Sequence, residues 1–344
     1  MSAKSLVRYL PGLVVLVVLV LLPYATFSLP GILSGRVNGP GSMTLLATCF
    51  IFAGFALSYD VIFGRTGLLS FGHALFVAAG SYLLTISLSA WELPLLLAIV
   101  VALAVTVGLA LIVGGIALRV GGIAFAMVTL AFAQAASIIV LRNPGDVTGG
   151  EEGLVLNREA IPSLLVGVQN APYRYWLALG FVVLAWVLVA LLVRSRAGHA
   201  MAAVRENEAR AAVLGYDVYR VKLLAIVVGA FIGGLGGIVH AIVLGGSSPH
   251  LTTTEFTLAL LVMVVLGGAG RLWGAVVGGF VYHYLDARLV EFSGSSALEA
   301  LPDVLQRLLG QPLLILGVLF IIVVYFAPQG LTGLGARVLR KGQA

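Results

Sequence analysis

Long apolar runs separated by short polar segments recur along the whole chain. Runs of this length are typical of membrane-spanning helices, whereas the strands of a membrane barrel alternate apolar and polar residues over roughly ten positions. The pattern therefore predicts an all-α polytopic membrane protein with about ten transmembrane helices. The expected spans are residues 10–29, 43–62, 66–88, 94–118, 122–141, 173–193, 222–245, 255–268, 272–290 and 312–328.

The first apolar run follows Lys4 and Arg8, as the apolar region of a signal peptide would. It is longer than such a region, and the residues around Ala25 lack the small-x-small cleavage pattern. We therefore expect an uncleaved first helix.

Residues 255–290 fit either one long tilted helix or two short helices that turn at Gly267-Gly268-Ala269-Gly270-Arg271. Basic residues in short loops mark the cytoplasmic side of a membrane. Two helices place Arg271 and the basic C-terminal tail on that side, whereas one helix would place the tail outside. The charges therefore favour two helices, with both termini in the cytoplasm and the acidic segments 142–172 and 291–311 outside.

Composition agrees with a membrane protein, because 60% of the residues are hydrophobic and only 10% are charged, against about 25% charged in soluble domains. We expect one transmembrane domain over residues 1–344, with a cytoplasmic loop at about 194–221 and an external loop at about 142–172. The formal net charge of +6 is spread over short loops. The expected partner is therefore the lipid bilayer, and no nucleic acid.

Five expected spans precede the 142–172 loop and five follow it, so the two halves would run in opposite directions. This arrangement permits an inverted repeat. Each half also has a glycine-rich turn, Gly64-Arg65-Thr66-Gly67 and Gly267-Gly268-Ala269-Gly270. Short helix hairpins need such turns in any case, so both interpretations stay open.

Glycines also recur at four-residue spacing, which places them on one face of a helix. One set is Gly229, Gly233 and Gly237, and the other is Gly270, Gly274 and Gly278. We expect close helix packing along both strips.

Enzyme chemistry is disfavoured by the residues that are present. The five histidines lack metal-binding spacing, no Gly-x-Ser-x-Gly motif occurs, and the single cysteine, Cys49, cannot form a disulfide within the chain. None of the three lysines follows a glycine, so the chain has no Walker A loop. We expect no cofactor in this chain.

The energy source is also expected outside this polypeptide. An ion-coupled carrier normally needs ionisable groups near the middle of the bilayer. Asp60 and Arg65 instead lie near the cytoplasmic end of the second span, and Glu255 begins the eighth. If ATP drives the protein, partner ATPase subunits bind the ATP and Mg, and a cytoplasmic feature must dock them.

The 194–221 loop contains a candidate for that feature. Residues 198–214 are predicted to form one amphipathic helix whose outward face includes Arg205, Glu206, Glu208 and Arg210. Glu206 and Arg210 have i,i+4 spacing, Gly215 would end the helix, and Asp217 would cap the next one. A solvated hairpin explains the pattern, but a rigid helix could also pass force from an ATPase to the bundle.

Five sequence blocks, in order over about residues 43–333, resemble one known family. These blocks resemble the M-type permease subunits of branched-chain amino acid ABC importers. They are Thr66-Gly67-Leu68-Leu69-Ser70-Phe71-Gly72-His73, Phe125-Ala126-Met127-Val128-Thr129-Leu130-Ala131-Phe132-Ala133-Gln134, Thr148-Gly149-Gly150-Glu151-Glu152-Gly153-Leu154, Arg205-Glu206-Asn207-Glu208-Ala209-Arg210-Ala211 with Leu214-Gly215, and Val262-Met263-Val264-Val265-Leu266-Gly267-Gly268 with Leu272-Trp273-Gly274.

The resemblance implies a type II-importer-like permease bundle in a bacterial-type inner membrane. Its expected partners are a homologous H-type permease, two cytoplasmic ATPase subunits, and an extracytoplasmic solute-binding protein that delivers leucine, isoleucine or valine. Similar systems carry urea, amides or other amino acids, so the solute stays open. An ATP-independent channel or ion-coupled carrier is the second function class.

The resemblance also suggests roles for individual residues. ATPase coupling is expected from Arg205, Glu206, Asn207, Glu208, Arg210 and Gly215, and binding-protein docking from Gly149, Gly150, Glu151 and Glu152. Polar residues that either line the pathway or bond helices together are Ser70, His73, Thr129 and Gln134. Asp60, Arg65 and the Glu151-Glu152 pair depart from the residues that are usual in the family.

The expected spans offer hydroxyls, an amide and helix termini, but no clearly central carboxylate or guanidinium. A zwitterionic solute held tightly within the membrane would need charged partners. We therefore expect a weak, transient pathway, with selectivity supplied mainly by the binding protein.

Overall fold

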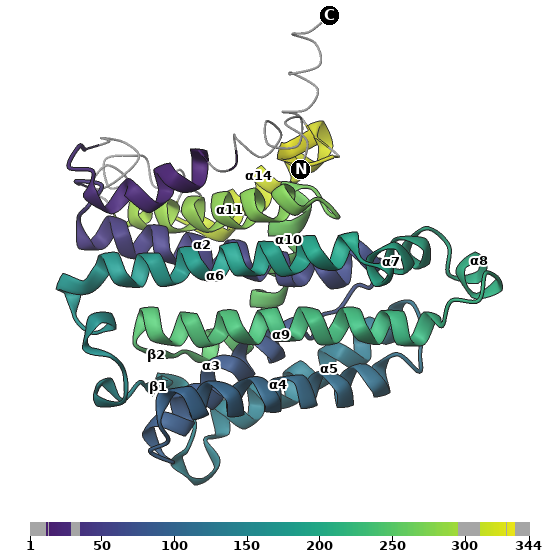
Figure 1. The fold of residues 1–344 in the computed structure, drawn as a ribbon, viewed down its shortest axis with the longest axis horizontal. Helices are drawn as coiled ribbons and strands as arrows, with labels where there is room; N and C mark the ends of the chain where they lie inside the picture. Colours follow the sequence, from purple (N-terminus) through teal and green to yellow (C-terminus); the bar gives the residue numbers. More distant parts are fainter. Residues whose placement is uncertain (1–11, 13, 29–34, 295–309, 328, 334–344) are drawn as a thin grey trace, which may run out of the picture.

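The computed structural model describes residues 12, 14–28, 35–294, 310–327 and 329–333, in which long helices lie side by side (Figure 1). Its α-helices are α2 (Pro40–Thr66), α3 (His73–Ser89), α4 (Leu95–Ala117), α5 (Ile123–Arg142), α6 (Ala171–Arg194), α7 (Arg196–Glu206), α8 (Glu208–Val213), α9 (Val218–Leu244), α10 (Thr254–Gly267), α11 (Leu272–Ser293) and α14 (Pro312–Phe326). A further helix spans Val14–Tyr24.

The remaining elements are short. The two strands are β1 (Leu154–Val155) and β2 (Gly246–Ser247). The 3-10 helices are η1 (Leu22–Tyr24), η2 (Pro144–Asp146), η3 (Gly150–Glu152), η4 (Arg158–Ala160), η5 (Ser163–Leu165), η6 (Val168–Asn170) and η7 (Pro249–Thr252). We call the two ends of the bundle the α7–α8 end and the β1–β2 end, because these elements lie at opposite ends in Figure 1.

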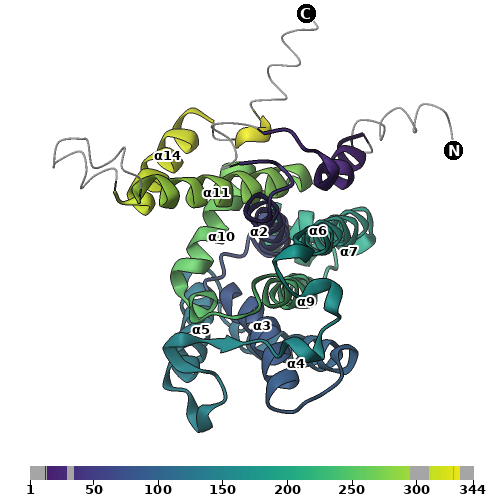
Figure 2. The ribbon, with the colours of Figure 1, turned by 90° about the vertical axis from the view of Figure 1, so that its left-hand side faces the viewer.

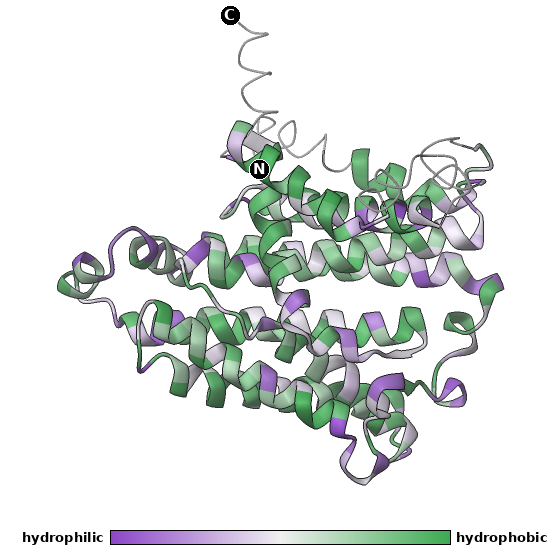
Figure 3. Ribbon diagram, turned by 180° about the vertical axis from the view of Figure 1, so that it is seen from behind, coloured by the Kyte–Doolittle hydropathy of each residue, from purple (hydrophilic) through white to green (hydrophobic). Residues whose placement is uncertain are grey.

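Each of the ten expected spans overlaps a helix of the described residues. Residues 10, 11, 13 and 29 of the first span and residue 328 of the last lie outside the described residues. By length and composition, six of the described helices can cross a membrane: α2, α4, α5, α6, α9 and α14. The helix at Val14–Tyr24, α3 and α10 are apolar but shorter. Figure 3 shows hydrophobic residues along the bundle and hydrophilic residues concentrated in the connecting segments at its ends.

The expected third span, 66–88, begins too early. Gly67 ends α2 in a left-handed conformation with φ 74°, and α3 begins only at His73. Left-handed glycine is a common helix end because it has no Cβ to clash with the backbone. The intervening residues form a non-helical break between the two helices.

The central helix of the bundle is α2, which packs against α6, α9, α10 and α11. In Figure 2 it lies beside α6 and above α9, surrounded by the other helices. Apolar residues on all its faces are buried, which is the pattern of a helix enclosed by other helices. The expected glycine strips pack closely: a Cβ on Gly237 of α9 would lie 2.1 Å from Val77 O of α3, and one on Gly278 of α11 would lie 2.0 Å from Met263 O of α10. Gly270, expected on the second strip, lies instead in the turn before α11.

Three expected helix boundaries are confirmed. Residues 255–290 form two helices, because α10 ends at Gly267 and Gly268 has φ 113°. Near the C-terminal end of the 194–221 segment, Asp217 Oδ1 accepts a hydrogen bond from Arg220 N and caps α9. Gly215, with φ 90°, follows the end of α8 as predicted.

The single helix expected over 198–214 is wrong, because the chain breaks at Asn207 into α7 and α8. The Asn207 side-chain oxygen accepts a hydrogen bond from Arg210 N at 2.9 Å and caps α8. Asparagine favours this capping role over a position inside a helix.

Candidate functional site

The two glycine-rich turns, far apart in sequence, meet at the α7–α8 end of the bundle. A Cβ on Gly64 of α2 would fall 2.6 Å from the backbone nitrogen of Gly270, in the turn between α10 and α11. Asp60 Oδ1, one helical turn before Gly64, accepts a hydrogen bond from Gly270 N at 2.7 Å. We call this contact, with the charged residues described next, the glycine-turn junction.

Three charged residues hold the glycine-turn junction. The Asp60 side chain is fully buried, and its Oδ2 lies 3.3 Å from Arg65 Nε, within ion-pair distance. Arg205, on α7, donates a hydrogen bond to Gly64 O. A buried carboxylate is tolerated when it is paired and hydrogen-bonded, so Asp60 and Arg65 support one another here.

The rest of the α7–α8 segment extends beyond the bundle (Figure 1). Lys222 of α9 forms an ion pair with Glu208 at 2.5 Å, whereas the described residues show no ion pair between Glu206 and Arg210. The predicted Glu206–Arg210 pair is missing because the break at Asn207 places Glu206 on α7 and Arg210 on α8. Val213 and Leu214, at the end of α8, are 88% and 69% exposed and form an apolar tip.

Three of the four expected pathway residues lie at the break before α3: Ser70 within it, His73 at the start of α3, and Thr129 on α5 beside it. Ser70 Oγ accepts from Gly72 N at 3.3 Å, and Thr129 Oγ1 of α5 accepts from Phe71 N at 3.1 Å. Both side chains are buried. These bonds satisfy backbone groups that the break leaves outside a helix, so Ser70 and Thr129 stabilise the break.

His73, at the start of α3, is fully buried and its Nε2 lies 2.8 Å from Ser58 Oγ of α2. Ser58 uses its hydroxyl proton to donate to Phe55 O, so His73 Nε2 donates to Ser58 Oγ and its Nδ1 carries the lone pair. The fourth candidate, Gln134, lies apart from the others and bonds through Nε2 to Thr254 Oγ1 at the start of α10. All four side chains therefore bond helices or turns together.

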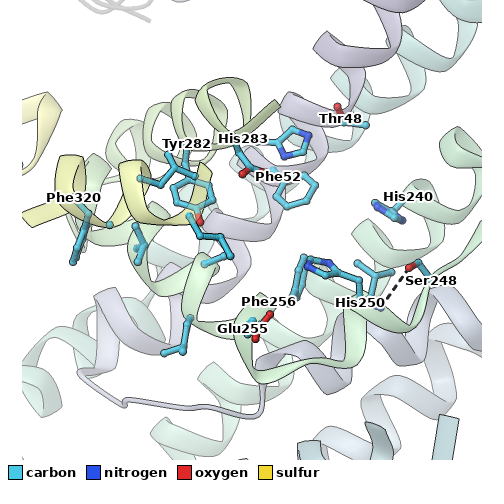
Figure 4. Close-up of a pocket in the computed structure, with 18 of the residues that line it drawn as sticks. Thr48, Phe52, His240, Ser248, His250, Glu255, Phe256, Tyr282, His283 and Phe320 are labelled. Atoms are coloured by element: carbon cyan, nitrogen blue, oxygen red, sulfur yellow. Dashed lines mark hydrogen bonds between the residues drawn. The ribbon is translucent and has the colours of Figure 1, made fainter. Parts of the chain in front are cut away.

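A cavity of about 660 Å³ lies toward the β1–β2 end, between α2, α9, α10, α11 and α14. We call it the histidine-lined cavity, because it is lined by His240, His250 and His283, which lie on α9, η7 and α11 (Figure 4). Glu255 of α10 and Asp286 of α11 also line it. Its size is that of a typical small-molecule site.

The walls of the histidine-lined cavity differ in chemistry. The His283 ring stacks on Phe52 of α2, with ring centroids 3.8 Å apart. Leu313, Leu316 and Phe320 of α14 line the wall formed by that helix. One part of the lining is therefore polar and another is apolar.

Sequence analysis missed this cavity, because its lining comes from five helices and a loop that are distant in sequence. It considered the histidines only for spacing along the chain, and it did not single out Asp286. One signal was present: His283 and Asp286 are ionisable residues inside an apolar run, where such residues are usually functional.

The expected docking loop lies at the β1–β2 end. Glu151 and Glu152 are exposed in η3, whereas Gly150 is buried. Just after them, β1 pairs antiparallel with β2 and so ties the loop to the segment that follows α9. The two carboxylates are thus presented at the surface from an anchored loop.

Comparison with known proteins gives a consistent result over most of the chain. Residues 41–325 match the family described as "Branched-chain amino acid transport system / permease component". The chain is 26% identical over 315 residues to the high-affinity branched-chain amino acid transport system permease protein LivM of Salmonella typhimurium, a match that covers 85% of this chain and 70% of the relative. The Escherichia coli LivM protein is 26% identical over 313 residues, with the same coverage of each chain.

A second type of relative matches a shorter segment. The autoinducer 2 import system permease protein LsrC of Klebsiella pneumoniae subsp. pneumoniae is 32% identical over 142 residues. That match covers 39% of this chain and 41% of the relative.

Proposed function

Since this chain belongs to the family of branched-chain amino acid transport permease components, we propose that it carries leucine, isoleucine or valine across the inner membrane. As an ABC importer permease it is a non-catalytic, multi-pass membrane component. Two observations support the solute. The matches to the LivM proteins cover 85% of the chain, against 39% for LsrC, and the histidine-lined cavity combines carboxylates with an apolar wall. A urea, amide or other amino acid importer is the alternative within the same family.

The proposed assembly contains this chain, an H-type permease, two ATPase subunits and an extracytoplasmic binding protein. Both termini and the α7–α8 end face the cytoplasm in this proposal. The charge pattern supports it, because Arg205 lies on α7 and Arg271 follows the turn that contacts it, whereas the exposed Glu151 and Glu152 lie just before β1. The β1–β2 end would then receive the binding protein.

Coupling to ATP hydrolysis is assigned to the α7–α8 segment and the glycine-turn junction. The apolar tip at Val213 and Leu214, with the exposed Glu206 and Arg210, offers a docking surface for an ATPase. Arg205 connects α7 to Gly64, and Asp60 connects the same part of α2 to Gly270. A displacement of α7 would thereby reach α2 and the turn between α10 and α11. Helices α2, α10 and α11 all border the histidine-lined cavity.

The observation that carries the proposal is the family match over residues 41–325. The test is uptake of radiolabelled L-leucine into proteoliposomes that contain this chain and its co-purifying subunits, with the binding protein added outside. We expect uptake only with ATP inside and with an ATPase subunit that can hydrolyse it. Uptake that continues with an inactive ATPase would indicate a channel or ion-coupled carrier, and ATP-dependent uptake of other solutes but not leucine would reassign the solute.

A further inference from the structure

The histidine-lined cavity is lined by several ionisable groups, which helix packing alone does not explain. Five of its lining residues can carry a charge: His240, His250, Glu255, His283 and Asp286. Such groups are costly next to lipid, so they usually face a polar occupant or one another. Asp286 is the most informative of them, because it lies within helix α11 and not in a loop.

The two carboxylates share the cavity with three histidines, and no lysine or arginine of the described residues lines it. Among the described residues, neither Glu255 nor Asp286 forms an ion pair, whereas Asp60 elsewhere in the bundle lies beside Arg65. Glu255 is exposed and Asp286 half-buried, so both can be reached from the cavity. A carboxylate that forms no ion pair with a lysine or arginine favours an occupant with positive charge.

His240 provides a second, independent sign of an occupant. Its side chain is 5% exposed, and its Nδ1 atom has no hydrogen-bond partner among the described residues. Figure 4 shows His240 on α9 facing the space opposite His283. Buried polar atoms are nearly always paired with protein or with a bound molecule, so a polar group of the occupant would complete this site.

The apolar wall limits what the occupant can be. Leu316 and Phe320 lie one helical turn apart on α14, and Phe256 of α10 is buried against the same cavity. These side chains suit a short hydrocarbon group. Because carboxylates and hydrocarbon side chains share the lining, the cavity favours an organic cation.

We propose that the histidine-lined cavity is a binding site of the permease itself for a compact solute with a protonated amine and an apolar side chain. Glu255 and Asp286 accept hydrogen bonds from the ammonium group, His240 contacts a second polar group, and the wall of α14 takes the hydrocarbon. The inference rests on the proposed function, and it adds that the permease selects for the ammonium group. It therefore differs from the expectation of a pathway without charged partners.

The test measures binding of radiolabelled isoamylamine, which has the leucine side chain and an ammonium group but no carboxylate. The full chain, with the subunits that remain bound to it, is placed in phosphatidylcholine nanodiscs without the binding protein. We expect isoamylamine to bind and 4-methylpentanoate, which lacks the ammonium group, not to compete. Glu255→Gln combined with Asp286→Asn should weaken binding about tenfold or more.

Matched variants exclude misfolding as the cause. Glu159→Gln makes the same substitution at an exposed position of η4, away from the cavity, and should bind as the wild type does. Glu255→Asp combined with Asp286→Glu keeps both charges and should restore part of the binding. Equal binding by wild type and by the charge-neutral double variant would overturn the proposal, as would full competition by 4-methylpentanoate.

Two further comparisons identify the occupant and separate the two proposals. Loss of isoamylamine binding when phosphatidylethanolamine is added to the discs would show that the site holds a lipid amine, and would overturn the solute role. L-leucine uptake by the same preparation is measured in parallel. Carboxylate-dependent isoamylamine binding without leucine uptake would uphold the cavity proposal and contradict the proposed solute, whereas uptake without isoamylamine binding would do the reverse.

Discussion

Arg205 of α7 donates a hydrogen bond to the backbone oxygen of Gly64, 141 positions earlier in the sequence. This bond joins the α7–α8 segment to the end of the central helix α2. On the far side of Gly64, Gly270 approaches so closely that no side chain fits between the two turns. The contact therefore gives the α7–α8 segment a direct mechanical connection to the bundle.

Replacing Arg205 by methionine should reduce solute uptake about tenfold, because a charged hydrogen bond contributes about 1.5–3 kcal/mol. The ATPase subunits should still co-purify, since the α8 tip is unchanged. The measurement is ATP-dependent uptake per mole of assembled complex. Arg196→Met is the control, because Arg196 is an exposed arginine at the start of the same helix. Equal losses in the two variants would contradict a special role for Arg205.

Gly64→Ala should disrupt the glycine-turn junction, because its Cβ would lie 1.8 Å from Asp60 Oδ1 and 2.6 Å from Gly270 N. Overpacking of this kind typically costs about 1–3 kcal/mol. Gly108→Ala, in α4, meets nothing within 4 Å and should leave stability equal or slightly higher. The measurement is the melting temperature of each variant in detergent. Similar melting temperatures for Gly64→Ala and Gly108→Ala would refute the close contact.

Asp60→Ala should destabilise the chain by about 3 kcal/mol, because it leaves Arg65 and Gly270 N without their buried partner. Combining it with Arg65→Leu should recover part of the loss, since the arginine charge is also removed. A double-mutant cycle on the free energy of unfolding measures this coupling. Strictly additive effects would show that the two charges do not interact.

Reversing Glu206 and Glu208 to lysine should weaken ATPase docking and break the Glu208–Lys222 ion pair. Membrane insertion should persist, because both side chains are exposed. The readouts are the amount of ATPase subunit retained through purification and the uptake rate. Normal values for both would identify the segment as a solvated hairpin without a coupling role.

Membrane orientation can be tested with single cysteines at Glu151 and Arg271 in a Cys49→Ser background. On intact cells, an impermeant thiol reagent should label the Glu151 position and leave the Arg271 position unlabelled, because basic residues mark the cytoplasmic side. Labelling after membrane permeabilisation shows that both cysteines are reactive. The opposite pattern would invert the proposed orientation.

Local features of the sequence predicted most helices and several of their ends. The apolar runs located ten helices, and Gly215 and Asp217 marked boundaries that the structure confirms. Asn207 was the local signal that was missed, since its capping preference splits the expected 198–214 helix. Hydropathy and capping act within a few residues, so a single sequence contains enough information to predict them.

The functional contacts depend on long-range packing. Asp60 and Gly270 are 210 positions apart, and the histidine-lined cavity takes His240, Glu255 and Asp286 from three different helices. Which side chains meet depends on how each helix is rotated and how closely its glycines let its neighbours approach. The sequence by itself determined that apolar helices form and where they end, because those are local preferences. Only the tertiary structure decided which charges are paired at the glycine-turn junction and which are left facing a cavity, because packing sets the distances between residues remote in sequence.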